Sequence, residues 1–133
     1  MNVVVFENEY ENVRTSFAAA NLIYFGKALQ IVNYPASQSC PDLRVIDPTA
    51  CIFVDIDLSA KSVLDGFELL EELLKSGFSR QQLVILTGHL NIGEKAKARG
   101  LADIAIITKP IEFRVLHQAL AKHQAQFWSP PTV

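Results

Sequence analysis

The segment Cys51-Ile52-Phe53-Val54-Asp55-Ile56-Asp57 decides the fold that this sequence predicts. Its first four residues are all apolar, which is typical of a β-strand that is buried on both faces of a parallel sheet. The apolar run then ends on two carboxylates, Asp55 and Asp57. A buried strand that ends in acids indicates a parallel sheet with a functional site at the carboxyl ends of its strands.

Two further apolar runs precede this segment, at residues 3–6 and 29–34, and each predicts a strand. Between them lies a helix that Gly26 stops. Its apolar face consists of Val13, Phe17, Ala20 and Tyr24. Residues 37–47 are interrupted and followed by proline, so we expect only a short second helix there.

The strongest helix signal comes after the two acids. Asp65 and Glu68 have the spacing of a capping box, and Gly77 supplies a stop. The apolar stripe of this helix contains Phe67, Leu70, Leu73 and Leu74. The remaining pattern predicts a strand at 83–86, a helix from Asn91 and Glu94 to Gly100, a strand at 104–107 and a helix from about Ile111 toward Phe127.

Five strands that alternate with about five helices predict an α/β fold, because right-handed crossovers place helices on both faces of a parallel sheet. The 133 residues suffice for one domain with a single core. Half of the residues are hydrophobic and the net charge is -2, which argues against a disordered chain and against nucleic acid or a membrane as partner. Cys40 and Cys51 lack the spacing of a zinc or redox motif, so we expect inert thiols.

Polar side chains follow or end four of the predicted strands. Glu7 and Asn8 follow the first, Asp55 ends the third, Thr87 follows the fourth and Lys109 follows the fifth. Ligands bind at this edge of an open parallel sheet, so we expect the groups to converge. A carboxylate can attack phosphorus when nearby cations neutralise the phosphoryl oxygens. The set predicts phosphoryl transfer to Asp55, with a divalent metal at the first strand and with Lys109 and Thr87 on the phosphoryl oxygens.

At these positions the sequence resembles the receiver domains of bacterial two-component response regulators. The resemblance covers nearly the whole chain and rests on the acidic end of the first strand and on the segments Val54-Asp55-Ile56-Asp57-Leu58, Leu86-Thr87-Gly88-His89 and Thr108-Lys109-Pro110-Ile111. It implies a flavodoxin-like sheet of strand order 2-1-3-4-5 with helices on both faces. It also implies that Asp55 is the phosphoacceptor, that Thr87 and Lys109 are catalytic, and that the Lys109–Pro110 bond is cis.

The same resemblance implies a cofactor and partners. Mg²⁺ would be held by Glu7, Asn8, Asp55 and the backbone carbonyl of Asp57, and the phosphoryl donor would be a sensor histidine kinase or a histidine phosphotransfer protein. Residues 1–126 would form a stand-alone receiver domain, followed by a tail at 127–133 and no effector domain. Such a cytoplasmic protein would catalyse only its own phosphorylation and dephosphorylation.

Three features depart from the family pattern. Asn8 stands where the family has a second acid, so we expect magnesium to bind weakly. Ile106 occupies the switch position, where receivers often carry an aromatic ring that turns inward on phosphorylation. The segment from Asp55 to Gly66 is longer than in the family, so the lid beside the acceptor is altered.

Two alternative functions stay open at this stage. One is a receiver-like adaptor that binds proteins without phosphorylation, for which Asn8 and Ile106 would reflect lost chemistry. The other is a haloacid-dehalogenase-like phosphatase, because those enzymes also use an Asp-X-Asp segment, a Thr or Ser and a distant Lys. They need further acids on a strand after that Lys, whereas the only acid after Lys109 is Glu112.

The other polar residues predict no second site. A basic cluster on the predicted fourth helix, consisting of Lys95, Lys97 and Arg99, suits a solvated face. The three histidines have no metal-ligand spacing; they are His89, alone in a loop, and His117 and His123, on different faces of the last helix.

The end of the last helix predicts packing. Phe127 and Trp128 are apolar and continue its buried stripe. Pro130 and Pro131 end the helix. We expect a two-fold homodimer through the fourth helix, fifth strand, fifth helix and tail, with a tail that folds back on its own domain as the alternative.

Overall fold

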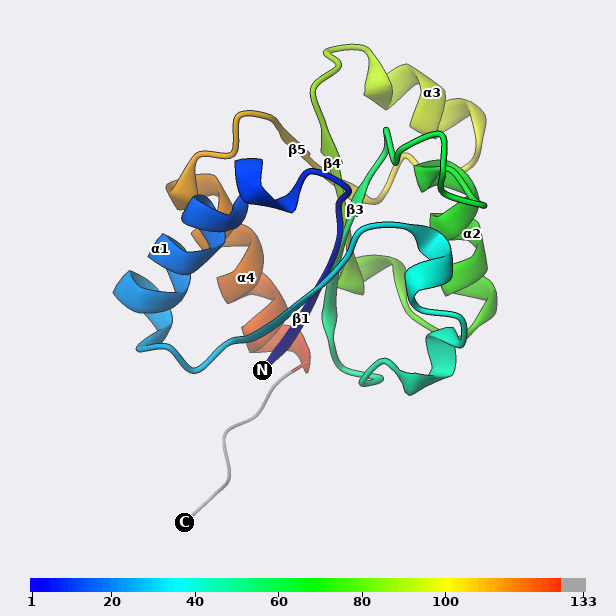
Figure 1. Cartoon of the computed structure of the whole chain (residues 1–133). Coiled ribbons are helices and arrows are strands. Elements are labelled where there is room, and N and C mark those ends of the chain that lie inside the picture. Colours follow the sequence, from blue (N-terminus) through cyan, green and yellow to red (C-terminus); the bar gives the residue numbers. More distant parts are fainter. Residues whose placement is uncertain (128–133) are drawn as a thin grey trace.

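The computed structural model describes residues 1–127, which form a five-stranded parallel sheet and four α-helices (Figure 1). The strands are β1 (Asn2–Phe6), β2 (Gln30–Tyr34), β3 (Cys51–Asp55), β4 (Leu83–Thr87) and β5 (Ala105–Thr108). The α-helices are α1 (Arg14–Phe25), α2 (Gly66–Lys75), α3 (Ile92–Ala98) and α4 (Phe113–Phe127).

The strand order is β2-β1-β3-β4-β5, and all neighbouring strands are parallel. The predicted order is therefore confirmed. In the register of the sheet, Val54 lies opposite Phe6 and Asp55 lies opposite Leu86. Adjacent strands thus end almost level with one another, so the polar groups at their ends emerge on one edge of the sheet.

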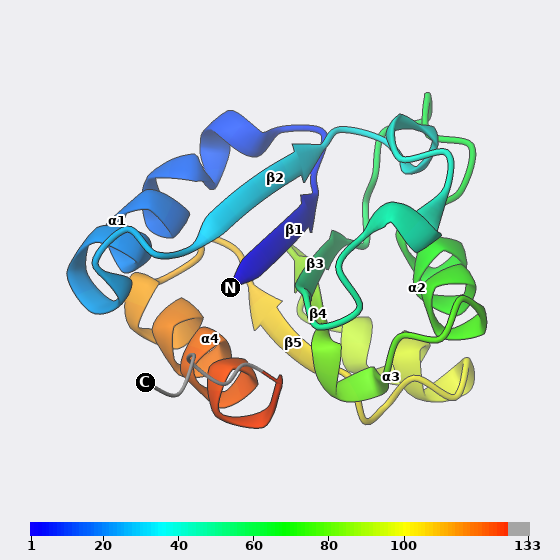
Figure 2. The same ribbon diagram turned by 90° about the horizontal axis from the view of Figure 1, so that it is seen from below.

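Two hydrophobic clusters fill the two faces of the sheet, each covered by two helices (Figure 2). On the face under α1 and α4, Phe17 packs edge-on against Phe53 of β3, with ring centroids 5.0 Å apart. On the face under α2 and α3, Leu70 and Leu73 are fully buried. Each such burial stabilises the fold by roughly 1.5–3 kcal/mol. Because both faces are covered, the central strands are apolar at consecutive positions.

Short local sequence signals determine most of the helix ends. The capping box is confirmed, since Asp65 accepts the Glu68 N–H at 2.8 Å and Glu68 accepts the Asp65 N–H at 3.1 Å. Gly26 ends α1 in the left-handed conformation, with φ 55°. Tyr24 lies at the edge of the predicted buried face: it is 39% exposed and its ring stacks on that of His117 from α4.

The prediction of a short second helix is wrong. The stretch forms two single 3₁₀ turns, Ser37–Ser39 and Leu43–Val45. Pro41 lies between them and cannot donate a helical hydrogen bond. The Asp42 side chain accepts the N–H of Arg44, a local bond that favours a turn over a continuing helix. Residues 1–127 therefore contain four α-helices instead of about five.

The predicted side-chain cap at Asn91 is also wrong. Asn91 precedes α3, but its side chain makes no capping hydrogen bond. Its backbone, with φ -100° and ψ 14°, is not in the extended conformation from which a capping side chain reaches the first free N–H groups. The helix ends at Ala98, and Gly100 follows in the left-handed region with φ 71°.

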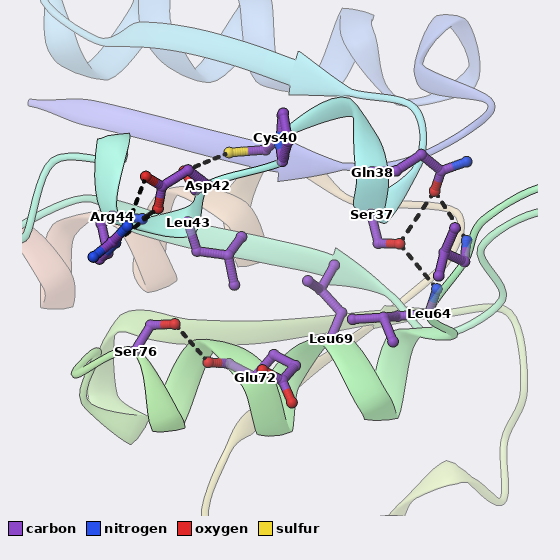
Figure 3. Close-up of a pocket in the computed structure, with 12 residues that line it drawn as sticks. Ser37, Gln38, Cys40, Asp42, Leu43, Arg44, Leu64, Leu69, Glu72 and Ser76 are labelled. Carbon is purple, nitrogen blue, oxygen red and sulfur yellow. Dashed lines mark hydrogen bonds and ion pairs between the residues drawn. The ribbon is translucent and has the colours of Figure 1, made fainter.

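The missing helix leaves a groove of about 530 Å³ between the two 3₁₀ turns and α2 (Figure 3). The loop after β3 forms one wall. It is tied to the first turn because Ser37 donates its N–H to Ser62 Oγ and Leu64 donates its N–H to Ser37 Oγ, both at 2.9 Å. The loop that follows β3 is therefore anchored to the first turn.

The last helix reaches Phe127, whose ring stacks on His123 with centroids 4.8 Å apart. This agrees with the predicted packing of Phe127. The predictions for Trp128, Pro130 and Pro131 fall outside the described residues. None of the helices in residues 1–127 is long and apolar enough to cross a membrane.

Candidate functional site

Two buried carboxylates form the centre of the candidate site. Asp55 ends β3 and is 3% exposed, and Glu7 directly follows β1 and is 1% exposed. The ammonium of Lys109, which follows β5, lies 2.7 Å from Glu7 Oε2 and 3.1 Å from Asp55 Oδ2. Glu7 and Lys109 are 102 positions apart in the chain, so the strand order brings them together.

The two carboxylates share one cation, and this affects the pKa values of the group. Burial raises the pKa of Glu7 to about 7, the hydrogen bond with Asp55 adds to the rise, and Lys109 partly offsets it. Burial opposes the charge on Lys109, but its hydrogen bonds to Glu7 and Asp55 and their charges raise its pKa above the ordinary value. Lys109 is therefore a fixed positive charge beside Asp55 at neutral pH.

Thr87 is fully buried at the end of β4. Its Oγ1 accepts the N–H of His89 at 2.9 Å, and its carbonyl oxygen accepts the N–H of Lys109 at 2.7 Å. A hydroxyl that accepts a hydrogen bond keeps its own proton free to donate. The Lys109–Pro110 bond is cis, as the resemblance implies.

Asp57 and His89 form a contact that the sequence did not reveal. Asp57 donates its backbone N–H to Asp55 Oδ1 at 2.9 Å, and its own Oδ2 lies 2.7 Å from His89 Nε2. The interpretation of His89 as a solitary loop residue is therefore wrong. A usable signal was present, because Asp57 and His89 each stand two positions after a residue of the predicted site.

The predicted magnesium ligands are oxygen donors, which the ion prefers, but they carry little charge. Glu7 and Asp55 together face one positive charge on Lys109, and the raised pKa of Glu7, about 7, leaves its carboxyl only partly ionised at neutral pH. Asn8 is exposed and adds only a neutral amide. Within residues 1–127, no group of three or more His, Cys, Asp or Glu side chains is placed to hold a metal ion. The donor atoms are of the type that magnesium prefers, but they do not converge into a ligand cluster in residues 1–127, so magnesium stays a proposal and would bind weakly.

No family model matches the sequence, and no curated protein matches it. Solved structures match over most of the chain. The receiver domain of NtrX from Brucella abortus is 22% identical, with a TM-score of 0.70 over 93% of this chain and 98% of its own. A response regulator receiver protein from Pseudoalteromonas atlantica is 18% identical, with a TM-score of 0.71 over 94% of this chain and 98% of its own.

The signal receiver domain of a DNA-binding response regulator from Colwellia psychrerythraea is 16% identical, with a TM-score of 0.72 over 95% of this chain and 99% of its own. The chain has the fold of a receiver domain. In this receiver fold, the predicted site residues Glu7, Asp55, Thr87 and Lys109 lie at the ends of four strands.

The lid of this receiver fold is long but keeps a tight start to α2. A β-carbon built on Gly66 would lie 2.5 Å from the carbonyl oxygen of Asp55 and 2.5 Å from the Cα of Ile56. The helix backbone therefore packs directly on the residue pair that carries the acceptor. The loop before Gly66 is anchored at Ser62.

Ile106, which the sequence predicts as a switch position, lies on an edge strand. Ile106 belongs to β5, which pairs only with β4 among the described strands, and its side chain is 36% exposed. Ala105 and Thr108 of the same strand are also exposed. An isoleucine side chain has no aromatic ring that could rotate toward Thr87.

Proposed function

We propose that this chain is the receiver domain of a response regulator and that it accepts a phosphoryl group on Asp55. The observation that carries the proposal is the ammonium of Lys109, 3.1 Å from a buried carboxylate oxygen of Asp55. A preorganised cation stabilises the charge that develops on a transferring phosphoryl group. The receiver fold supports a response-regulator role in general.

The donor would be a phosphohistidine of a sensor histidine kinase or of a histidine phosphotransfer protein. A carboxylate oxygen of Asp55 attacks phosphorus, so that a P–O bond forms while the P–N bond to the donor imidazole breaks. The imidazole leaves with the electrons of that bond and takes up a proton. Lys109 and the hydroxyl proton of Thr87 donate hydrogen bonds to the phosphoryl oxygens.

Magnesium, held by Glu7, Asn8, Asp55 and the backbone carbonyl of Asp57, would supply further neutralisation of the phosphoryl oxygens. We expect weak binding, because Asn8 brings no charge and Lys109 offsets one carboxylate. Lys109 then carries a large share of the charge stabilisation.

Output would pass through protein contacts or onward transfer of the phosphoryl group in the cytoplasm. A phosphoryl group adds roughly -1.5 to -2 charge, which attracts the Thr87 hydroxyl and biases the adjoining surface of α3, β5 and α4. That surface includes the exposed edge strand with Ile106. An isologous contact between two such surfaces would form the homodimer.

The test is phosphorylation with acetyl phosphate and magnesium, followed by intact mass. We expect a single phosphate adduct on the wild type and none on Asp55→Asn, which keeps the size of the side chain. Asp103→Asn, at an exposed acid far from the site, is the matched control and should be phosphorylated normally. An adduct that persists in Asp55→Asn would remove Asp55 from the proposal.

A phosphorylation-independent adaptor is the second candidate, favoured by the exposed amide of Asn8 and by Ile106. It predicts no adduct on the wild type under any magnesium concentration. A phosphatase is less well supported, because Glu112, the acid after Lys109, is exposed and precedes α4 instead of lying on a strand.

A further inference from the structure

A closed ring of contacts joins the acceptor to its neighbours through His89. Asp55 Oδ1 accepts the N–H of Asp57, and Asp57 Oδ2 contacts His89 Nε2. The N–H of His89 donates to Thr87 Oγ1, and the Thr87 carbonyl accepts the N–H of Lys109. The Lys109 ammonium returns to Asp55 Oδ2. Each step of the ring is 3.1 Å or shorter.

His89 is the member of this ring that spans two loops. Its backbone fixes the hydroxyl of Thr87, while its imidazole reaches the loop that follows β3. Packing holds the His89 loop only weakly, since Leu90 is 91% exposed and a β-carbon on Gly88 would meet nothing within 4 Å. The side-chain contact with Asp57 therefore contributes to where the His89 N–H lies.

We infer that His89 is a positioning residue, which through its contact with Asp57 orients the Thr87 hydroxyl before any phosphoryl group arrives. The N–H of His89 occupies an acceptor site on Oγ1, so the hydroxyl proton is directed elsewhere and stays available for a phosphoryl oxygen. The effect of this orientation on the rate of phosphorylation rests on the proposed function. The orientation of the Thr87 hydroxyl itself is a property of the unphosphorylated protein.

The exposure of the His89 and Asp57 side chains sets the expected size of the effect. The side chains of His89 and Asp57 are 61% and 56% exposed, so the pair is weak and opens readily. Losing an exposed pair of this kind changes an equilibrium by roughly two- to fivefold. We therefore expect His89 to tune the rate of acceptor phosphorylation, in contrast to the large loss expected from removing Lys109.

The first test is amide hydrogen exchange, read by NMR, in the unphosphorylated protein. In Asp57→Ala the amide at position 89 should exchange roughly two- to fivefold faster, while the amide of Gln30, bonded to the Met1 carbonyl at the opposite end of the strands, should not change. Asp57→Asn keeps an oxygen that can accept from His89 Nε2, so it should restore the slower rate. An unchanged rate at position 89 in Asp57→Ala overturns the inference.

The second test is a double-mutant cycle on the rate of phosphorylation by acetyl phosphate. Asp57→Ala and His89→Ala should each slow the reaction, and the double variant should be no slower than the slower single variant, because both remove the same contact. If the effects of the two substitutions on the rate multiply in the double variant, the residues act separately, and this result would overturn the inference. If the wild type takes no phosphate at all, the proposed function fails, and the exchange experiment still decides the role of His89.

Discussion

Gly66 lies so close to Ile56 that a β-carbon on the glycine would be 2.5 Å from the Cα of the isoleucine. The contact is between backbone atoms, which cannot move aside as the end of a flexible side chain can. This close approach places the first turn of α2 directly on Ile56, the residue after Asp55. The position of the acceptor therefore depends on the absence of a side chain at position 66.

Gly66→Ala should destabilise the protein by about 1–3 kcal/mol, toward the upper end because backbone must shift. It should also slow phosphorylation, since Asp55 moves with its neighbour. Gly93→Ala in α3 is the control, because a β-carbon there meets nothing within 4 Å. Alanine favours helix, so that variant should be neutral or more stable. Equal unfolding midpoints in denaturant for both variants would contradict the prediction.

Lys109→Ala should lower the rate of phosphorylation by about 10²-fold, because the transferring group loses its fixed cation. The measurement is the time course of the mass adduct with acetyl phosphate. Lys97→Ala removes an exposed lysine of α3 and should react like the wild type. A rate for Lys109→Ala within twofold of wild type would exclude Lys109 from the chemistry.

Asn8→Asp should tighten magnesium binding by roughly tenfold, because it adds one negative charge beside the cation. Titration calorimetry measures the affinity, and phosphorylation should reach its maximum rate at a lower magnesium concentration. Asn12→Asp, on the 3₁₀ turn that follows, adds the same charge at an exposed position and controls for general electrostatics. Equal affinities in the two variants would show that position 8 does not bind the metal.

Because His123 is buried, we expect the protein to lose stability on acidification. His123 is 2% exposed, its Nε2 lies 2.7 Å from the Thr49 carbonyl, and its Nδ1 has no hydrogen-bond partner among the described residues. Burial lowers its pKa below the ordinary 6.5, although the Thr49 carbonyl and Asp47 oppose this. The unfolded chain therefore binds a proton more readily than the folded one, so the stabilisation is complete above pH 6.5 and is lost as pH falls below it.

The check is denaturant unfolding at about pH 8 and about pH 5.5, on either side of the histidine range. His123→Gln can still donate to Thr49 but does not titrate, so its stability should fall less between the two pH values than that of the wild type. His117→Gln removes a histidine that stacks on Tyr24 at the surface and serves as the control. If the three proteins lose the same stability, His123 is not the source.

Ile106 is the centre of the proposed homodimer contact. Ile106→Glu places a charge on this exposed position of β5 and should convert a dimer to a monomer in light scattering at tens of micromolar, because burying an unpaired charge in an interface is costly. Val45→Glu adds a charge at a side chain that is 71% exposed on a 3₁₀ turn and should leave the assembly unchanged. A wild type that is monomeric both with and without phosphorylation would exclude the dimer.

The strands and α2 could be predicted because their signals are local. A run of consecutive apolar residues identifies each central strand, and the capping box at Asp65 and Glu68 identifies the helix start. The crossover between β2 and β3 could not be predicted in the same way. Its turns are held partly by Ser62, which is 25 positions from Ser37 and offers no pattern in the sequence that links the two.

In the candidate site, too, some residues could be predicted from local sequence signals and some contacts could not. Asp55 and Thr87 could be named because each lies at the end of a strand, where the parallel sheet fixes its place. The contact between Asp57 and His89 joins two loops. The sequence places each residue two positions after a site residue, but no periodic pattern shows that the two side chains meet. The burial of His123 was missed for a related reason, since its partner Thr49 lies 74 positions away.

The two hydrophobic clusters also set an order for folding during synthesis. Among residues 1–127, the cluster under α2 and α3 includes no residue beyond Ile104, whereas the cluster under α1 and α4 includes Leu116 and Leu120 together with Phe17. A nascent chain can therefore close one face of its sheet while α1 still lacks its partner helix. Ribosomes add about 5–20 residues per second, so Phe17 and its neighbours stay uncovered until the last helix has left the exit tunnel.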